Sequence, residues 1–246
     1  MKIFYSFIAV TFFCFSPKIL AQQIQTDRPN ETESPNTVLA KHLQIESGFS
    51  FEQDHSDKTF EIPELVLRYG IIKNFEVRVE TALKIAHEDD SNLFGIQPVV
   101  LGAKYHITDH KGAVPDIGVL ARVSIPWMAD NAYQEKYYSP EIRVLAQHEL
   151  TKVTRLGYNL GIHWLPDSLQ PEYVYTLSAD HSLTKKIKLF VESYGFAVPQ
   201  HHAENTVDTG LLFIVNKNIQ LDFITGTGIM HANSEKFAEV GFSVRI

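Results

Sequence analysis

From residue 42 to the last residue, apolar and polar side chains alternate along the chain in twelve runs. A period of two places neighbouring side chains on opposite faces of a β-strand, so the runs predict an all-β protein of about twelve antiparallel strands. Long segments with the helical period of 3.6 are hard to find. The expected strands cover residues 42–52, 64–71, 75–85, 99–107, 116–125, 141–150, 155–164, 172–180, 187–192, 207–215, 219–226 and 239–246.

The connections between these runs alternate in kind. Short turns that carry lysine lie near residues 73–74, 109–112, 151–152, 185–186 and 216–218. Longer, more acidic loops are expected at residues 53–58, 87–91, 128–137, 166–171, 199–205 and 231–236. This alternation indicates a sheet whose two ends face different surroundings, as in an up-and-down barrel that crosses a bacterial outer membrane. The short turns and both termini would then lie in the periplasm.

One face of the predicted sheet is apolar and the other is charged, which fits either of two barrels. A soluble barrel turns its apolar face inward, whereas a membrane barrel turns it toward lipid. Glycines on the polar face and aromatic residues near the ends of the apolar face favour the membrane barrel. These aromatic residues are Tyr69, Tyr105, Tyr158, Trp164, Tyr173 and Phe242. We therefore expect a closed transmembrane barrel over residues 42–246, with outer-membrane lipid around it and the barrel-assembly machinery as a partner during insertion.

The first residues predict export. Residues 1–21 begin with Lys2, continue as an apolar run and end at Ala21, which is the pattern of a cleaved signal peptide. Cleavage would remove Cys14, the single cysteine, and would leave 20 basic against 29 acidic side chains. The resulting charge of about −9 argues against a nucleic-acid partner. Residues 22–41 are rich in turn-forming residues and predict either a plug inside the lumen or a disordered periplasmic tail.

The polar face is expected to line the lumen with charges of both signs. A lumen of about twelve strands is narrow compared with that of a porin, so opposite charges could pair across it. They could form a selectivity lining for a polar solute, or a salt-bridged interior that holds the barrel together. The predicted lumen-lining residues are Glu64, Arg68, Glu76, Arg78, Glu80, Lys104, Arg122, Arg143, Glu192, Asp208, Asp222, Glu239 and Arg245.

Enzymatic chemistry has weaker support in the sequence. Ser178, His163 and Asn159 face inward on adjacent predicted strands and could serve an outer-membrane lipid hydrolase. No G-x-S-x-G motif accompanies them. The acidic clusters at residues 87–90 and 201–204 are best interpreted as solvated loop tips. The sequence therefore predicts no enzyme, no metal site and no cofactor.

Several short motifs resemble one bacterial family. The segment Thr26-Asp27-Arg28-Pro29 is followed by Thr32-Glu33-Ser34, and further motifs stand at residues 44–48, 67–70, 75–78, 101–105, 190–195 and 220–222. The series resembles the outer-membrane family described as "Putative MetA-pathway of phenol degradation". The resemblance implies an outer-membrane β-barrel of a Gram-negative bacterium that passively transports a small, hydrophobic or aromatic solute. A sealed structural or binding barrel is the main alternative.

Overall fold

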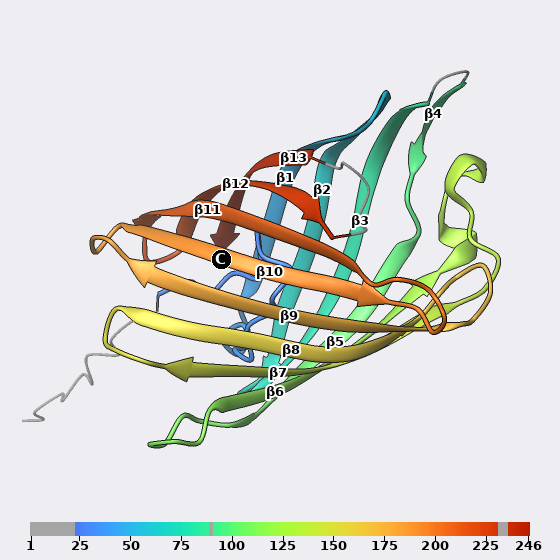
Figure 1. The fold of residues 1–246 in the computed structure, drawn as a ribbon. Helices are drawn as coiled ribbons and strands as arrows, with labels where there is room; N and C mark the ends of the chain where they lie inside the picture. The colour runs from blue at the N-terminus through green and yellow to red at the C-terminus, as the bar shows by residue number, and fades with distance from the viewer. Residues whose placement is uncertain (1–22, 89–90, 231–235) are drawn as a thin grey trace, which may run out of the picture.

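The computed structural model describes residues 23–88, 91–230 and 236–246, which form a barrel of antiparallel strands (Figure 1). The predicted signal peptide, residues 1–21, lies outside the described residues. The strands are β1 (Leu43–Asp54), β2 (Asp57–Ile72), β3 (Phe75–Glu88), β4 (Ser91–Ile96), β5 (Val99–Thr108), β6 (Asp116–Ile125), β7 (Ser139–Glu149), β8 (Thr154–Trp164), β9 (Pro171–Ser182), β10 (Ile187–Ala197), β11 (Glu204–Asn216), β12 (Ile219–Ile229) and β13 (Lys236–Arg245).

Neighbouring strands pair in an up-and-down order, and two further pairings close the sheet. β1 pairs with β13, and β2 pairs with β3, so the sheet closes on itself. β4 and β5 both pair with β3 and are separated at Gln97 and Pro98, where proline has no N–H to donate. They act as one interrupted strand, and the predicted barrel of twelve strands is confirmed.

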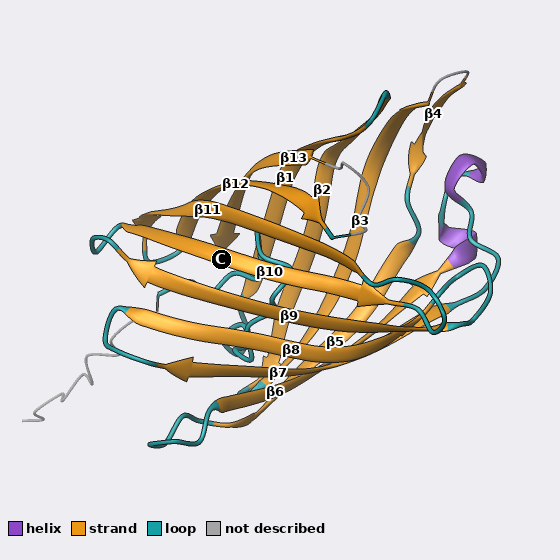
Figure 2. Cartoon of the chain, viewed as in Figure 1, coloured by secondary structure: helices purple, strands orange, loops and turns teal. Residues whose placement is uncertain are grey.

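The connections alternate between the two ends of the barrel, but their lengths depart from the prediction. The ladder between β1 and β2 continues to the pair Asp54 and Asp57, so most of the expected loop at residues 53–58 is strand. At the opposite end, the turn after β5 extends over residues 109–115. We call the end that carries the lysine turns the short-turn end, and the other the long-loop end. The long-loop end includes residues 126–138, with the short 3-10 helices η1 (Pro126–Met128) and η2 (Asn131–Tyr133), purple in Figure 2.

No helix in the described part of the chain is long and apolar enough to cross a membrane.

Burial is the reverse of that in a water-soluble protein. Arg68 and Lys104 are fully buried, while Leu160 and Val191 are 64% and 56% exposed. Soluble proteins rarely bury so many charges or expose such a continuous apolar surface. The apolar face of the sheet therefore points outward and the charged face inward, which excludes the soluble barrel. Four of the predicted girdle aromatics are exposed on the outside: Tyr69, Tyr105, Tyr173 and Phe242.

Candidate functional site: the filled barrel interior

Residues 23–41, which we call the inner segment, occupy the interior of the barrel. The N–H of Ile24 donates to the carbonyl of Lys217 over 2.8 Å, and the N–H of Lys41 donates to that of Gly70 over 2.6 Å. Both contacts lie at the short-turn end. Between them the segment rises into the barrel and returns, as the blue trace in Figure 1 shows.

Carboxylates of the barrel wall hold the backbone of the inner segment. One oxygen of Glu46 accepts hydrogen bonds from the N–H groups of Asp27 and Arg28, at 3.1 and 2.9 Å. On the opposite wall, Glu192 accepts from the N–H groups of residues 31 and 32, at 2.9 and 2.6 Å. These contacts satisfy backbone N–H groups that a buried loop would otherwise leave unpaired.

Arg68 on β2 is the centre of the ion-pair network nearest the short-turn end. It is fully buried and meets Asp27, Glu46 and Glu76 at 3.0, 2.7 and 2.9 Å. A guanidinium offers five donors in a planar fork, which suits contact with several carboxylates at once. Arg68 therefore links two wall strands to the inner segment.

Lys104 and Arg78 bind the two carboxylates of the inner segment. The Lys104 ammonium lies 2.6 Å from Asp27 and 2.8 Å from Glu33, and Arg78 contacts both of the same carboxylates. Burial by itself would raise the pKa of Glu33, but Arg78 and Lys104 outweigh it and hold that pKa well below its ordinary value of 4.5. Glu33 is therefore ionised in the folded protein at neutral pH.

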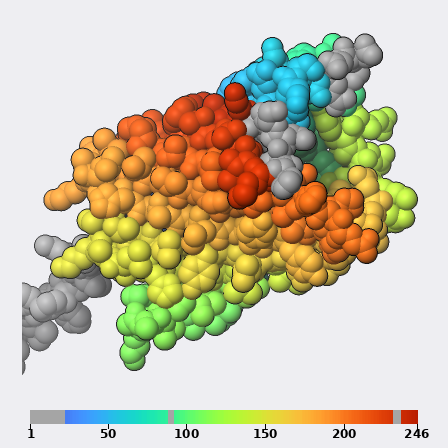
Figure 3. All heavy atoms as spheres, in the orientation of Figure 1, coloured from blue at the N-terminus to red at the C-terminus, as the bar shows by residue number. Residues whose placement is uncertain are grey.

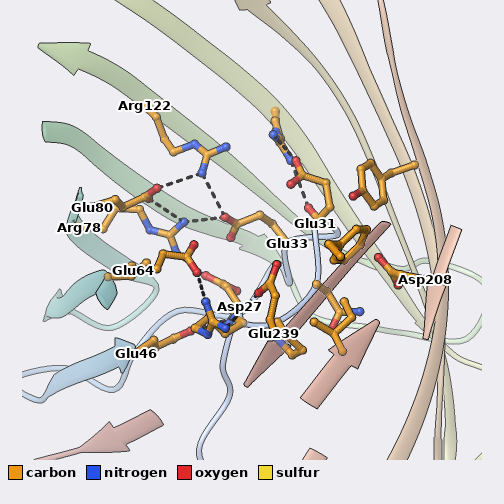
Figure 4. Close-up of a pocket in the computed structure, with 18 residues that line it drawn as sticks. Asp27, Glu31, Glu33, Glu46, Glu64, Arg78, Glu80, Arg122, Asp208 and Glu239 are labelled. Carbon is orange, nitrogen blue, oxygen red and sulfur yellow. Dashed lines mark hydrogen bonds and ion pairs between the residues drawn. The ribbon is translucent and has the colours of Figure 1, made fainter. Parts of the chain in front are cut away.

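A second tier of ion pairs lies nearer the long-loop end. Arg122 lies 3.1 Å from Glu80 on β3 (Figure 4) and 2.9 Å from Glu141 on β7. Arg143 on β7 contacts Glu141 and reaches Glu31 of the inner segment at 2.6 Å. The wall made by β2, β3, β5, β6 and β7 thus supplies cations as well as carboxylates.

The wall made by β10 to β13 is acidic. Arg28 of the inner segment reaches across to this wall, where it lies 3.1 Å from Glu239 and 3.6 Å from Asp222, and it also contacts Glu64 on β2. Asp208 is a cross-strand partner of Glu192. Among the residues that the structure describes, neither of these two carboxylates forms an ion pair with a lysine or arginine.

A cavity of about 180 Å³ lies on the long-loop side of the inner segment. It separates the wall that supplies cations from the acidic wall of β10 to β13. Eight carboxylate side chains and four guanidinium groups line it. Figure 4 shows the paired side chains on one side of the cavity and Asp208 on the other. In the space-filling view, a recess is visible near the strand ends at the right of the picture (Figure 3).

The remaining predicted residues lie at other places along the interior. Thr26 donates to the carbonyl of Arg28 over 2.9 Å and accepts from Gln220 over 2.7 Å. Pro29 lines the cavity. Arg245 stands apart from the central network, because it donates to the backbone of the turn at residues 217–218 and to the Asn218 side chain.

Sequence reasoning did not predict that three of these polar residues hold the segment. Glu46 and Glu33 belong to the central network, and Asn159 both accepts from the N–H of Glu33 over 2.7 Å and donates to its carbonyl over 3.0 Å. Glycines on the inner face were the available signal. A Cβ at Gly48 would overlap the Arg28 guanidinium, and one at Gly70 would overlap the backbone at Leu39. These strands leave space for the inner segment.

The three residues considered for hydrolysis are not brought together. Ser178 accepts from Asn30 over 3.0 Å, and Asn159 binds the inner segment. His163 instead contacts Ser139 through Nε2 at 2.6 Å and Glu172 through Nδ1 at 3.0 Å. This order of atoms is that of a catalytic triad. Ser139 is only 3% exposed, however, and its hydroxyl also lies 2.6 Å from the Trp164 carbonyl, so a substrate has no access to it in this structure.

One group in the described residues has the composition of a metal site, although the sequence predicted none. Ligand atoms of His106, Asp109 and Asp116 lie within 4.8 Å of one another at the short-turn end. Nδ1 of His106 faces the carbonyl of Pro35 at 3.1 Å. The Asp109 side chain is 91% exposed and Asp116 accepts from the N–H of His110, so ordinary turn contacts account for the group.

Solved structures with the same fold are outer-membrane barrels. An outer membrane channel from Pseudomonas putida F1 superposes with a TM-score of 0.66 at 10% identity, over 90% of this chain and all of that one. The KdgM porin in complex with disordered oligogalacturonate gives 0.59 at 10% identity, over 82% and 98% of the two chains. The NanC porin also gives 0.59 at 10% identity, over 81% and 98%. At these identities the likeness shows a shared fold.

Comparison by sequence points to one family. None of the functionally curated proteins compared with the chain matches its sequence. The family described as "Putative MetA-pathway of phenol degradation" matches residues 26–246, which include most of the inner segment and the whole barrel. The chain therefore belongs to this family, as its motifs predicted.

Proposed function

We propose that the protein is a passive channel for small solutes in the outer membrane of a Gram-negative bacterium, and that the inner segment is its plug. The observation that carries this proposal is the way the segment is held. Its contacts with the wall are mostly polar and charged, and it enters and leaves at one end of the barrel. Polar contacts can be exchanged for water when the segment moves, whereas an apolar core would resist hydration.

The surroundings of the barrel follow from its surface. Its apolar outer face fits outer-membrane lipid, and its closed sheet fits insertion by the barrel-assembly machinery. We place the short-turn end in the periplasm and the long-loop end outside the cell, as is general for such barrels. The inner segment would then enter from the periplasm, and the cavity would lie on the extracellular side of the plug.

The solute is a small molecule that fits a narrow lumen. The family description points to aromatic compounds. The KdgM porin, which has the same fold, was solved with oligogalacturonate, an acidic oligosaccharide. The excess of carboxylates around the present cavity argues against an anion of this kind.

A sealed barrel is the second candidate, because the inner segment fills the interior in this structure. Arg28, Asp27 and Glu33 each contact at least two strands of the wall, and removal of such groups from their partners is costly. Conductance therefore separates the two candidates. A channel must move it or conduct around it, whereas a sealed barrel does neither.

A reversible crosslink tests this directly. The side chains of Asn30 and Ser178 touch at 3.0 Å, and the chain beyond residue 21 contains no cysteine. In the double variant Asn30→Cys, Ser178→Cys, oxidation should tie the inner segment to β9. We expect unit conductance in planar bilayers for the wild-type protein and for the reduced variant, and loss of conductance on oxidation.

The single variant Ser178→Cys is the matched control and should conduct under both conditions. If the crosslinked and reduced proteins conduct equally, the inner segment is not the gate. If wild-type protein that is folded by heat-modifiable gel migration shows no conductance, and liposomes take up solute no faster than empty vesicles, the sealed barrel is favoured instead.

A further inference from the structure

Asp208 and Asp222 on the acidic wall carry buried carboxylate oxygens without a hydrogen-bond partner in the described structure, and Asp222 differs in that it lies 3.6 Å from Arg28. Asp208 is 5% exposed, and its Oδ1 has no hydrogen-bond partner. Its carboxylate lines the cavity and points toward it from β11 (Figure 4). Buried polar atoms are nearly always paired, so an unpaired oxygen at the edge of a cavity indicates a place for a donor.

The nearest charged groups make that donor a cation. Glu239 shares the cavity with Asp208, and Glu192 is the cross-strand partner of Asp208. Arg28 is the cation that reaches this wall, and its guanidinium is engaged by Glu64, Asp222 and Glu239. An ammonium group would donate a hydrogen bond to the unpaired oxygen of Asp208 and would place a positive charge within this cluster of carboxyl groups.

Apolar side chains lie beside these carboxylates, on the inside of the barrel. Phe190, Leu212 and Ile224 are buried together, and Phe237 packs against them. Ile224 and Phe237 line the same cavity as Asp208, together with Tyr194. Most of the inner face is charged, so this apolar patch is unusual. An apolar patch beside an unpaired carboxylate fits a ligand with an apolar body and a cationic end.

We propose that the cavity is a binding site for a small organic ammonium ion, with its charged group at Asp208 and Glu239 and its aromatic or alkyl body against Phe237 and Ile224. The proposal rests on the channel function above and defines its solute class. Neutral and anionic molecules of the same shape would bind less well, because they leave the carboxylates desolvated and unpaired.

Titration calorimetry with three matched probes tests the site without relying on transport. Benzylamine, benzyl alcohol and benzoate share a ring and differ in charge. We expect benzylamine to bind the detergent-solubilised protein at least tenfold more tightly than the other two at neutral pH. Asp208→Asn should weaken benzylamine binding about tenfold, and Glu239→Gln by a smaller factor. Asp167→Asn, at an exposed loop position outside the cavity, should leave it unchanged.

Equal binding of the three probes, or undiminished benzylamine binding in folded Asp208→Asn protein, would overturn the inference. Conductance measurements distinguish failure of the ammonium-site proposal from failure of the proposed channel function. With a salt gradient across the bilayer, the reversal potential should show preference for cations, and benzylamine should block the current in wild-type protein more strongly than in Asp208→Asn. If the barrel conducts but prefers anions, the ammonium site is contradicted and the channel function still stands. If benzylamine binds but the protein does not conduct, the channel function is contradicted and the protein is a binding barrel.

Discussion

On the side of the barrel built by β2, β3 and β5, buried carboxylates meet Arg68, Arg78 and Lys104 at ion-pair distance. On the side built by β10 to β13, Asp222 and Glu239 share Arg28, and Asp208 keeps an unpaired oxygen. A buried charge is tolerated when it is paired and hydrogen-bonded, and is costly when it is not. The difference indicates that the first wall supplies most of the ion pairs that hold the inner segment, whereas the second also holds it but retains capacity for a ligand.

Arg68→Ala should give the largest loss of stability, because it would leave Asp27, Glu46 and Glu76 without a shared cation. Breaking a buried network in this way costs about 3–5 kcal/mol. Urea unfolding of the barrel in detergent, followed by heat-modifiable gel migration, measures the change. Arg155→Ala is the control, since Arg155 pairs with Asp180 at a more exposed position and should cost about 1 kcal/mol or less. Equal losses in the two variants would contradict the central role of Arg68.

One chemical change made on both walls should have opposite effects. Glu76→Gln removes a charge that faces Arg68 and accepts from the N–H of Val38, and it should cost about 2–3 kcal/mol. Asp208→Asn replaces a buried carboxyl group that has no cationic partner in the described structure, and it should be neutral or stabilise by up to about 1 kcal/mol. The same unfolding assay compares them. If Asp208→Asn lowers the free energy of unfolding, the Asp208 carboxylate makes stabilising contacts in the acidic wall, and the contrast between the two walls is wrong.

The strand pattern could be predicted from the sequence because its cause is local. Alternation at positions such as Arg68 and Tyr69 fixes which face each residue occupies, and the structure places the first inside and the second outside. The connection lengths were less predictable, since the β1–β2 ladder continues to Asp54 and Asp57 through polar residues that read as a loop.

The partners of the inward residues could not be predicted in the same way. Contact between Glu192 and residues 31–32 joins positions far apart in the chain, and period-two alternation carries no information about which strands lie opposite. The alternation also could not distinguish a wall whose carboxylates are paired with cations from a wall whose carboxylates are not, because both walls carry carboxylates at alternate positions. The inward glycines at residues 48 and 70 were the sign that something occupies the lumen.

Protonation of Glu33 at low pH should weaken its contacts with the barrel wall. We expect the free energy of unfolding to fall by about 2 kcal/mol. Because Arg78 and Lys104 hold the folded-state pKa of Glu33 well below 4.5 despite its burial, its contribution is fully present above the unfolded pKa. That contribution is lost as the pH falls through the lower, folded-state pKa. The difference in unfolding free energy between wild type and Glu33→Gln should therefore stay constant from pH 7 to pH 5 and shrink below pH 4.5. A difference that vanishes already at pH 6 would show that Glu33 is not ionised in this network.

The smallest expected effect concerns one contact of the acidic wall with the backbone of the inner segment. A protease that cuts after glutamate should cleave the folded wild-type barrel at Glu149, which is exposed, and spare Glu33, which is buried. Glu192→Gln replaces the acceptor of the N–H groups at residues 31 and 32 by a weaker one, at a cost of about 1 kcal/mol. Cleavage at Glu33, followed by mass spectrometry, should then rise about fivefold relative to that at Glu149, because exposure of a buried site follows the population of its open state. Rapid cleavage at Glu33 in the wild-type protein would instead show that the acidic wall does not retain the segment.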